Sequence, residues 1–169
     1  MNAQNYTQKS LQAIQAAQQL TIQNQNQQIE QVHLLSALLQ QDGGLVPQLL
    51  KKMGISVESL DAAVTAEVNK LPRVTGSGRE ADRFYVSRQV DEALTKSEEL
   101  AKGMKDDFVS VEHLLLALID CADNTLKNLL RTYNIKKEDV LQTLQTIRGN
   151  QRVTNDTPED TYEALEKYG

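Results

Sequence analysis

The chain has 169 residues, of which 40% are apolar and 4% aromatic, and its formal net charge at pH 7 is −5. An acidic chain without tryptophan lacks the basic stripes and stacking platforms of nucleic-acid-binding proteins, and no apolar run is long enough to span a membrane. Its single cysteine, Cys121, has no partner for an internal disulfide. We therefore expect a cytoplasmic protein that binds neither nucleic acid nor membrane.

The first half of the chain predicts four short helices. Thr7 is a suitable N-cap for a helix that runs to about residue 21, with apolar residues at helical spacing. A second helix is expected over about residues 30–41, a short third helix ends at Gly54, and Ser56 caps a fourth. No segment alternates with the period of a strand, so the predicted fold class is all-α.

The second half repeats this plan 80 residues later. The segment His33-Leu34-Leu35 returns as His113-Leu114-Leu115, and the similarity on either side of it needs no gap. The sequence therefore predicts one domain of eight short helices over residues 1–148, built from two four-helix repeats with pseudo-two-fold symmetry. The first repeat is expected over about residues 5–70 and the second over about 85–148. The helices of the second repeat are expected over about 87–102, 110–121, 125–133 and 136–148.

Two polar segments lie outside the predicted helices. "LPRVTGSGREADRFYVS" joins the repeats, and "GNQRVTNDTPED" follows the second repeat and is predicted to be mobile. Thr157-Pro158 is a good helix start, although it lies close to the end of the chain. We therefore expect residues 149–169 to be a flexible linker and the first helix of a further module in a longer chain.

No set of residues predicts catalysis or metal binding. His33 and His113 occupy the same place in each repeat, which favours an architectural role over metal binding. The segment 76–81, "GSGREA", fits the loose dinucleotide fingerprint but lacks the flanking strand, so a linker is the better interpretation. The phosphate-binding GxxxxGK[ST], HExxH and CxxC motifs are missing from the sequence, and Cys121 is interpreted as a packing residue.

The remaining candidate site is a groove where the two repeats meet. It would have an apolar floor and acidic rims, formed by Val90, Leu94, Phe108, Asp106, Asp107 and Glu112. Such a surface suits extended segments that carry hydrophobic and basic side chains. The alternative is that the apolar members of this set belong to the core.

Five phrases carry a resemblance to a known family: "YTQKSLQAIQAAQQL", "IEQVHLLSALLQQDGG", "LPRVTGSG", "FVSVEHLLLALID" and "TPEDTYEALEKYG". On these phrases the whole chain resembles the N-terminal domain of the Clp ATPases, and within that family it is most similar to the ClpB-type AAA+ disaggregase chaperones. The last phrase is the most specific, because double Clp repeats are shared with the protease-linked unfoldases of the ClpA and ClpC types.

The resemblance implies a mobile domain tethered to a homohexameric, ATP-driven threading ring, where it binds unfolded or aggregated clients weakly. ATP and magnesium would be bound by modules beyond Gly169. The fragment itself is therefore expected to have no enzymatic activity and no cofactor, and to be monomeric. Two alternatives stay open, an adaptor-docking domain of a ClpA- or ClpC-type unfoldase and a freestanding helical interaction module.

The resemblance also implies which residues bind clients. The family positions match Thr7, Asp106 and Glu112, with an apolar groove that would include Val90 and Leu94. Thr7 also has a plain interpretation as a helix cap, and Glu112 as an acid in the first turn of a helix.

Overall fold

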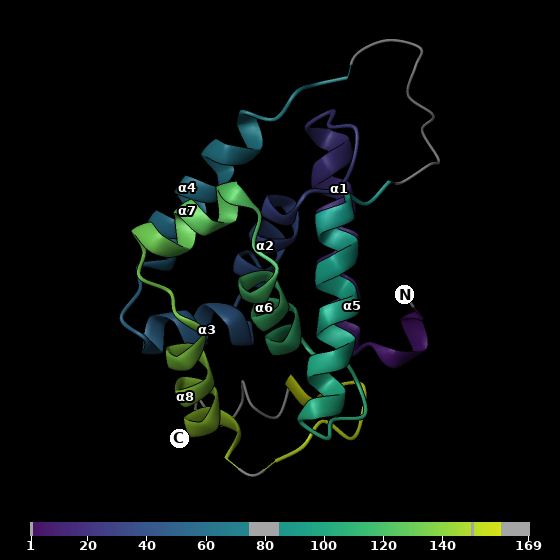
Figure 1. The fold of residues 1–169 in the computed structure, drawn as a ribbon, viewed down its shortest axis with the longest axis vertical. Coiled ribbons are helices and arrows are strands. Elements are labelled where there is room, and N and C mark those ends of the chain that lie inside the picture. The colour runs from purple at the N-terminus through teal and green to yellow at the C-terminus, as the bar shows by residue number, and fades with distance from the viewer. Residues whose placement is uncertain (1, 75–84, 150, 160–169) are drawn as a thin grey trace.

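The computed structural model describes residues 2–74, 85–149 and 151–159, and the regular elements over these ranges are helices (Figure 1). A 3-10 turn, η1 (Ala3–Asn5), precedes the first α-helix. The α-helices are α1 (Gln8–Gln23), α2 (Gln31–Leu39), α3 (Leu45–Lys52), α4 (Val57–Asn69), α5 (Arg88–Gly103), α6 (Val111–Asp120), α7 (Asn124–Thr132) and α8 (Lys137–Arg148). The predicted all-α class with eight short helices is confirmed.

The internal duplication is also found in the helix boundaries and in the backbone conformation. The first residues of α1 and α5 are Gln8 and Arg88, so the helices begin at the 80-residue shift found in the sequence. Left-handed backbone conformations recur at the same shift: Gln25 and Lys105 both have positive φ, at 56° and 60°. Non-glycine residues adopt such φ values infrequently, so their recurrence marks the same turn in both repeats.

The duplicated histidines lie in the first turns of the two central helices, α2 and α6. The backbone N–H of Glu30 donates to Nδ1 of His33 at 2.8 Å, and the N–H of Ser110 donates to Nδ1 of His113 at 2.9 Å. Histidine thus takes the third-residue position of a capping box, where glutamate or glutamine is usual. Because Nδ1 accepts in both rings, the proton lies on Nε2. Burial lowers the pKa of His33 to about 4.

The Nε2 atoms point to equivalent partners with different chemistry. His33 donates to the amide oxygen of Asn26 at 2.8 Å, and His113 donates to the carboxylate of Asp106 at 2.8 Å. Asn26 and Asp106 are equivalent under the 80-residue shift. All ring nitrogens of the two histidines are therefore engaged with protein groups, in agreement with an architectural role.

Helices α2 and α6 form the centre of the molecule (Figure 1). Every residue of α2 is buried, as are Val111–Leu118 of α6, including the equivalent Leu34 and Leu114. Helix α1 packs on α2 and α5 on α6, whereas α4 packs on α7 and α3 on α8, across the two repeats. Each fully buried leucine contributes about 1.5–3 kcal/mol relative to an exposed one, so the shared centre holds the repeats together.

Short backbone bridges join the segment before the first helix of each repeat to the segment before the second helix of the other repeat. An isolated parallel bridge joins Tyr6 to Val109, and its symmetric counterpart joins Ile29 to Val86. In the first bridge the N–H of Thr7 donates to the carbonyl of Val109 at 2.9 Å. This reciprocal exchange makes the two repeats one packed body.

The predicted linkers are only partly described. The inter-repeat segment 75–84, including the fingerprint-like "GSGREA", lies outside the described residues. So does most of the helix predicted to start at Pro158, because the description ends at residue 159. Residues 151–159 are described, and they run beneath α5, α6 and α8 at the base of the molecule, yellow in Figure 1.

Candidate functional site

The five residues predicted to bind clients are all buried. Val90 and Leu94 face inward from α5 and belong to the apolar core, with exposed fractions of 2% and 7%. Thr7, Asp106 and Glu112 are also buried, and they lie close to the segment 151–159. Their role in client binding stays a prediction, but clients have no direct access to them in this arrangement.

Asp106 is the most heavily bonded of these residues. It accepts hydrogen bonds from Nη2 of Arg148 at 2.7 Å, from Nε2 of His113 at 2.8 Å and from the backbone N–H of Val153 at 2.9 Å. Burial raises the pKa of Asp106, but the bonds from His113, Arg148 and Val153 outweigh it and hold that pKa low, at about 2. Asp106 is therefore an anionic anchor at neutral pH.

Arg148, the last residue of α8, neutralises a second buried carboxylate. Its Nη1 lies 3.4 Å from Oε2 of Glu112, which belongs to the first turn of α6. Both carboxylate side chains are fully screened from solvent, and that of Arg148 is 5% exposed. One guanidinium thus lies between Asp106 and Glu112, which brings together two of the predicted positions.

Glu159 adds a third carboxylate to the cluster. Its Oε2 accepts a hydrogen bond from the hydroxyl of Thr7 at 2.6 Å and another from the N–H of Val111 at 3.1 Å. Burial, together with the nearby charge of Glu112, raises the pKa of Glu159 to about 7. Its other oxygen, Oε1, is buried and has no hydrogen-bond partner within the described part of the chain. This carboxylate is thus accommodated less favourably than Asp106.

The segment 151–159, which we call the tail strap, is fixed to the domain along its length. Nε of Arg152 donates to the carbonyl of Lys105 at 2.7 Å, and the N–H of Asp107 donates to the carbonyl of Val153 at 2.7 Å. Further along, the N–H of Gln8 donates to the carbonyl of Asp156 at 2.8 Å. The side chain of Val153 is completely buried. The sequence predicted a mobile linker here and did not identify these contacts.

A signal for the strap is present in the sequence. The tripeptide Arg-Val-Thr occurs at 73–75, after the fourth helix of the first repeat, and again at 152–154, after the fourth helix of the second. In the first repeat the N–H of Val74 donates to the carbonyl of Gln25 at 2.7 Å, and Arg73 forms an isolated bridge with Asn26. The same short motif therefore returns to the same turn in both repeats.

The second repeat differs from the first in charge around this turn. At the shift of 80, four neutral amides, three glutamines and one asparagine, are replaced by three acids and an aromatic residue. The pairs are Gln18 with Glu98, Asn26 with Asp106, Gln27 with Asp107, and Gln28 with Phe108. The two turns have the same backbone conformation but carry different side chains.

An open pocket of about 340 Å³ lies beside Asp106 in the second repeat. Phe108, Ala101 and Val109 supply apolar wall, and the charged residues at the rim are the acids Glu98 and Asp107 and the cation Lys102. Phe108 is half-buried and Asp107 is exposed. Of the residues predicted to form the groove, Phe108, Asp106 and Asp107 line this pocket, whereas Val90 and Leu94 lie in the core.

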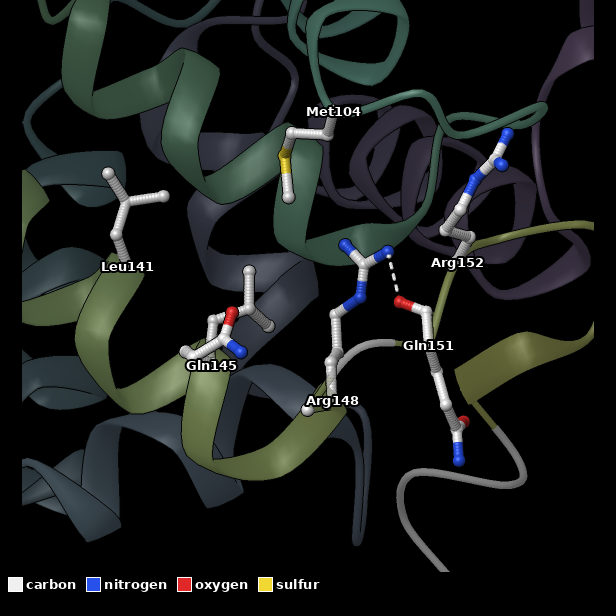
Figure 2. A pocket seen from close by; sticks show the side chains of 8 residues that line it. Met104, Leu141, Gln145, Arg148, Gln151 and Arg152 are labelled. Carbon is white, nitrogen blue, oxygen red and sulfur yellow. Dashed lines mark hydrogen bonds between the residues drawn. The ribbon is translucent and has the colours of Figure 1, made fainter.

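A second pocket, of about 360 Å³, lies between α8, the end of α5 and the start of the strap (Figure 2). Figure 2 shows Met104 and Leu141 on its apolar side and the guanidinium of Arg148 beside the strap. Nη2 of Arg148 donates to the carbonyl of Gln151 at 3.0 Å. Arg148 therefore binds both the start of the strap, at Gln151, and the carboxylate of Asp106.

Within residues 2–74, 85–149 and 151–159, no three His, Cys, Asp or Glu side chains are grouped to hold a metal ion. Over the same residues, no helix has both the length and the apolar character needed to cross a bilayer.

Two four-helix repeats pack together as one duplicated helical domain, and each has a histidine in the capping box of its central helix. The model of the Clp repeat (R) N-terminal domain family matches residues 5–133, and the chain belongs to this family. Chaperone protein ClpB of Clostridium perfringens is 38% identical over 170 residues, and that of Bacillus anthracis is 40% identical over 169. Both alignments cover 100% of this chain but only 20% and 19% of the relative. The chain thus spans about a fifth of the length of these relatives.

Solved structures have the same fold at low identity. The N-terminal domain of Hsp104 from Candida albicans has a TM-score of 0.79 and 22% identity, and the match covers 92% of this chain and 99% of that one. A complex of the ClpV N-domain with a VipB peptide has a TM-score of 0.65 and 19% identity, covering 88% and 89% of the two chains. These likenesses show the fold.

Proposed function

We propose that this chain is the client-binding N-terminal domain of an ATP-dependent protein disaggregase of the ClpB type. Similarity to ClpB chaperones over the whole chain supports this function. The hexameric ring, its ATP and its magnesium would belong to modules outside the chain, and the domain itself would carry no catalytic step. In the cytoplasm it would hold unfolded or aggregated polypeptide near the ring and so raise its local concentration.

The pocket around Phe108 is the observation that carries the proposal. Its apolar wall suits a hydrophobic side chain of an unfolded client, and the rim of Glu98 and Asp107 suits a lysine or arginine next to it. Extended segments that are rich in both kinds of residue are exposed by unfolded proteins. A domain of the same fold, that of ClpV, has been solved with a peptide bound.

Binding at this pocket is expected to be weak. A flexible client loses conformational freedom when it binds, and a single pocket of about 340 Å³ contacts only a few side chains. Weak and rapidly reversible contact suits a domain that passes its client on. Tethering several copies to one ring would provide the overall affinity.

An NMR titration with reduced, carboxymethylated α-lactalbumin tests the proposal. We expect chemical-shift changes at residues 98–109, and a five- to tenfold loss of affinity in Phe108→Ser without loss of helicity. Tyr85→Ser is the matched control, because Tyr85 is an exposed aromatic residue away from the pocket, with 53% of its surface accessible. Equal affinity of Phe108→Ser and wild type would contradict the proposed site. Binding of one folded adaptor but not of α-lactalbumin would favour a protease-linked unfoldase.

A further inference from the structure

The tail strap occupies the place at which three predicted client-binding residues would meet a ligand. Thr7 donates to Glu159, Asp106 accepts from the backbone of Val153, and Glu112 lies beside Glu159. We infer that residues 151–159 are an internal ligand, and that the receptor beneath them also accepts a separate extended segment in which a basic residue precedes valine or another small apolar residue. This inference rests on the proposed function and specifies the client class of a surface that adjoins the pocket around Phe108.

The strap is held in the way that a bound peptide is held. Residues 151–154 have no helix or turn of their own and are fixed by hydrogen bonds to the turn at 105–107. The N–H of Val153 donates to Asp106, and its carbonyl accepts from the N–H of Asp107. Backbone bonds of this kind do not depend on the side chains of the ligand, so they suit many extended sequences.

Side-chain preference comes from two contacts. The side chain of Val153 is fully buried, so the receptor encloses a side chain of that size. The guanidinium of Arg152 donates to the carbonyl of Lys105 at 2.7 Å. A segment with a basic residue and then a small apolar one therefore repeats both contacts, and a large or acidic residue at the second position would not fit the place of Val153.

The first repeat has the same dipeptide at the same turn, held by different hydrogen bonds: the N–H of Val74 donates to the carbonyl of Gln25, and Arg73 donates to the side chain of Asn24. Arg73 and Val74 return to the turn at Gln25 and Asn26, as Arg152 and Val153 return to the turn at 105–107. The two dipeptides are identical and follow equivalent helices. The recurrence of the pair at the same turn supports a preference of this turn for a basic residue followed by a small apolar one.

The buried carboxylate of Glu159, at the far end of the strap, makes docking of the strap less favourable. A client segment can therefore replace the strap. Glu159 brings a carboxylate next to Glu112, and its Oε1 is buried without a hydrogen-bond partner within the described part of the chain. Arg148 forms ion pairs with Asp106 and Glu112, whereas Glu159 has the hydroxyl of Thr7 and the N–H of Val111 as its partners. An uncompensated buried charge opposes docking, so a client segment without an acid at this point competes favourably.

Release of the strap would also enlarge the binding surface. The pocket beside Leu141 is bordered by Gln151 and Arg152 of the strap, and the pocket beside Phe108 is bordered by Asp106, which holds Val153. Both pockets therefore border residues that hold the strap or belong to it. A client segment that takes the place of the strap would lie over its track and reach Phe108 at the same time.

Two substitutions in the strap test the inference because they act in opposite directions. Val153→Ser removes the buried apolar side chain and loosens the strap, so affinity for carboxymethylated α-lactalbumin should rise about three- to tenfold. Glu159→Gln removes the buried charge but keeps an oxygen for Thr7 and Val111, so the strap tightens and the same affinity should fall two- to fivefold. Val74→Ser, the same change at the equivalent site of the first repeat, is the matched control and should leave affinity unchanged.

A synthetic peptide with the sequence of residues 149–160 provides the second measurement. We expect it to bind the Val153→Ser variant more tightly than wild type, and to compete with α-lactalbumin. Client affinity unchanged in both strap variants, with no competition by the peptide, would overturn the inference while the proposed function stands. Loss of client affinity in both variants would also overturn it, because the strap would then be only structural. If α-lactalbumin binds no variant but the peptide binds Val153→Ser, the receptor is supported and the proposed function fails.

Discussion

The guanidinium of Arg148 lies 2.7 Å from the carboxylate of Asp106, a residue 42 positions earlier, and the pair is buried beneath the tail strap. The contact joins the end of α8 to the turn that follows α5. Because Arg148 also lies against Glu112, it is the cation on which two buried carboxylates of this cluster depend.

Replacement of Arg148 by methionine should destabilise the domain by about 3–5 kcal/mol, because Asp106 and Glu112 would stay buried without a counter-charge. Urea unfolding followed by circular dichroism measures this loss. Arg131→Met is the matched control, since Arg131 is exposed on α7 and its replacement should change stability by less than about 0.5 kcal/mol. Similar losses in both variants would show that the buried cluster does not depend on its cation.

The buried His33 should make the domain less stable in acid. Burial lowers the pKa of His33 to about 4, whereas the unfolded chain has the ordinary value of 6.5. Between these values the unfolded state binds a proton that the folded state does not. The contribution of His33 is therefore complete above pH 6.5 and declines as the pH falls towards 4, by up to about 3 kcal/mol.

The variant His33→Gln isolates this effect. Glutamine is a usual third residue of a capping box, so the helix start is kept while the titrating group is lost. Urea midpoints of both proteins between pH 7 and pH 4 should converge as the pH falls. A stability difference that is constant over this interval would show that His33 does not titrate between the two states.

Docking of the tail strap should weaken as the pH rises. Burial and the charge of Glu112 raise the pKa of Glu159 to about 7 in the docked strap, against an ordinary 4.5 in the free one. The docked state therefore holds a proton that the free strap loses, and docking weakens as the pH rises from 4.5 to 7. The other groups that face Glu159 are the hydroxyl of Thr7 and the N–H of Val111.

Hydrogen exchange at the amides of Asp107 and Val153, corrected for the intrinsic pH dependence of exchange, measures strap docking. In Glu159→Gln the corrected protection should no longer fall between pH 4.5 and 7. If wild type and Glu159→Gln have the same profile, the buried carboxylate does not control docking.

The acidic rim should make client binding dependent on salt. Changing Glu98 and Asp107 together to glutamine gives this pocket the amides of the first repeat, Gln18 and Gln27. Each exposed charge pair contributes about 0.2–1 kcal/mol, so affinity for a lysine-rich unfolded client should fall roughly two- to tenfold at low salt. Fluorescence anisotropy at two salt concentrations measures this change. The double variant should have the flatter salt dependence, and parallel curves would contradict a role for the rim.

The duplication and the helices follow from the sequence because helical periodicity and end signals are local. The helix predicted over 87–102 is observed at Arg88–Gly103, and the helix predicted from 110 begins at Val111. The repeat was visible because the buried residues of α2 and α6 are under the same packing constraint in both copies. The sequence also indicated that Asp106 and Glu112 belong with Thr7, through the family resemblance.

The tertiary structure alone decided whether those residues are accessible. Thr7 and Glu159 are 152 residues apart, and their hydrogen bond depends on how α1, α6 and the strap come together in space. The strap is polar and lacks a helical period, so its sequence is indistinguishable from a linker unless the repeated Arg-Val-Thr is noticed. Its order comes from backbone hydrogen bonds and from one buried valine, which are tertiary contacts that no local pattern specifies.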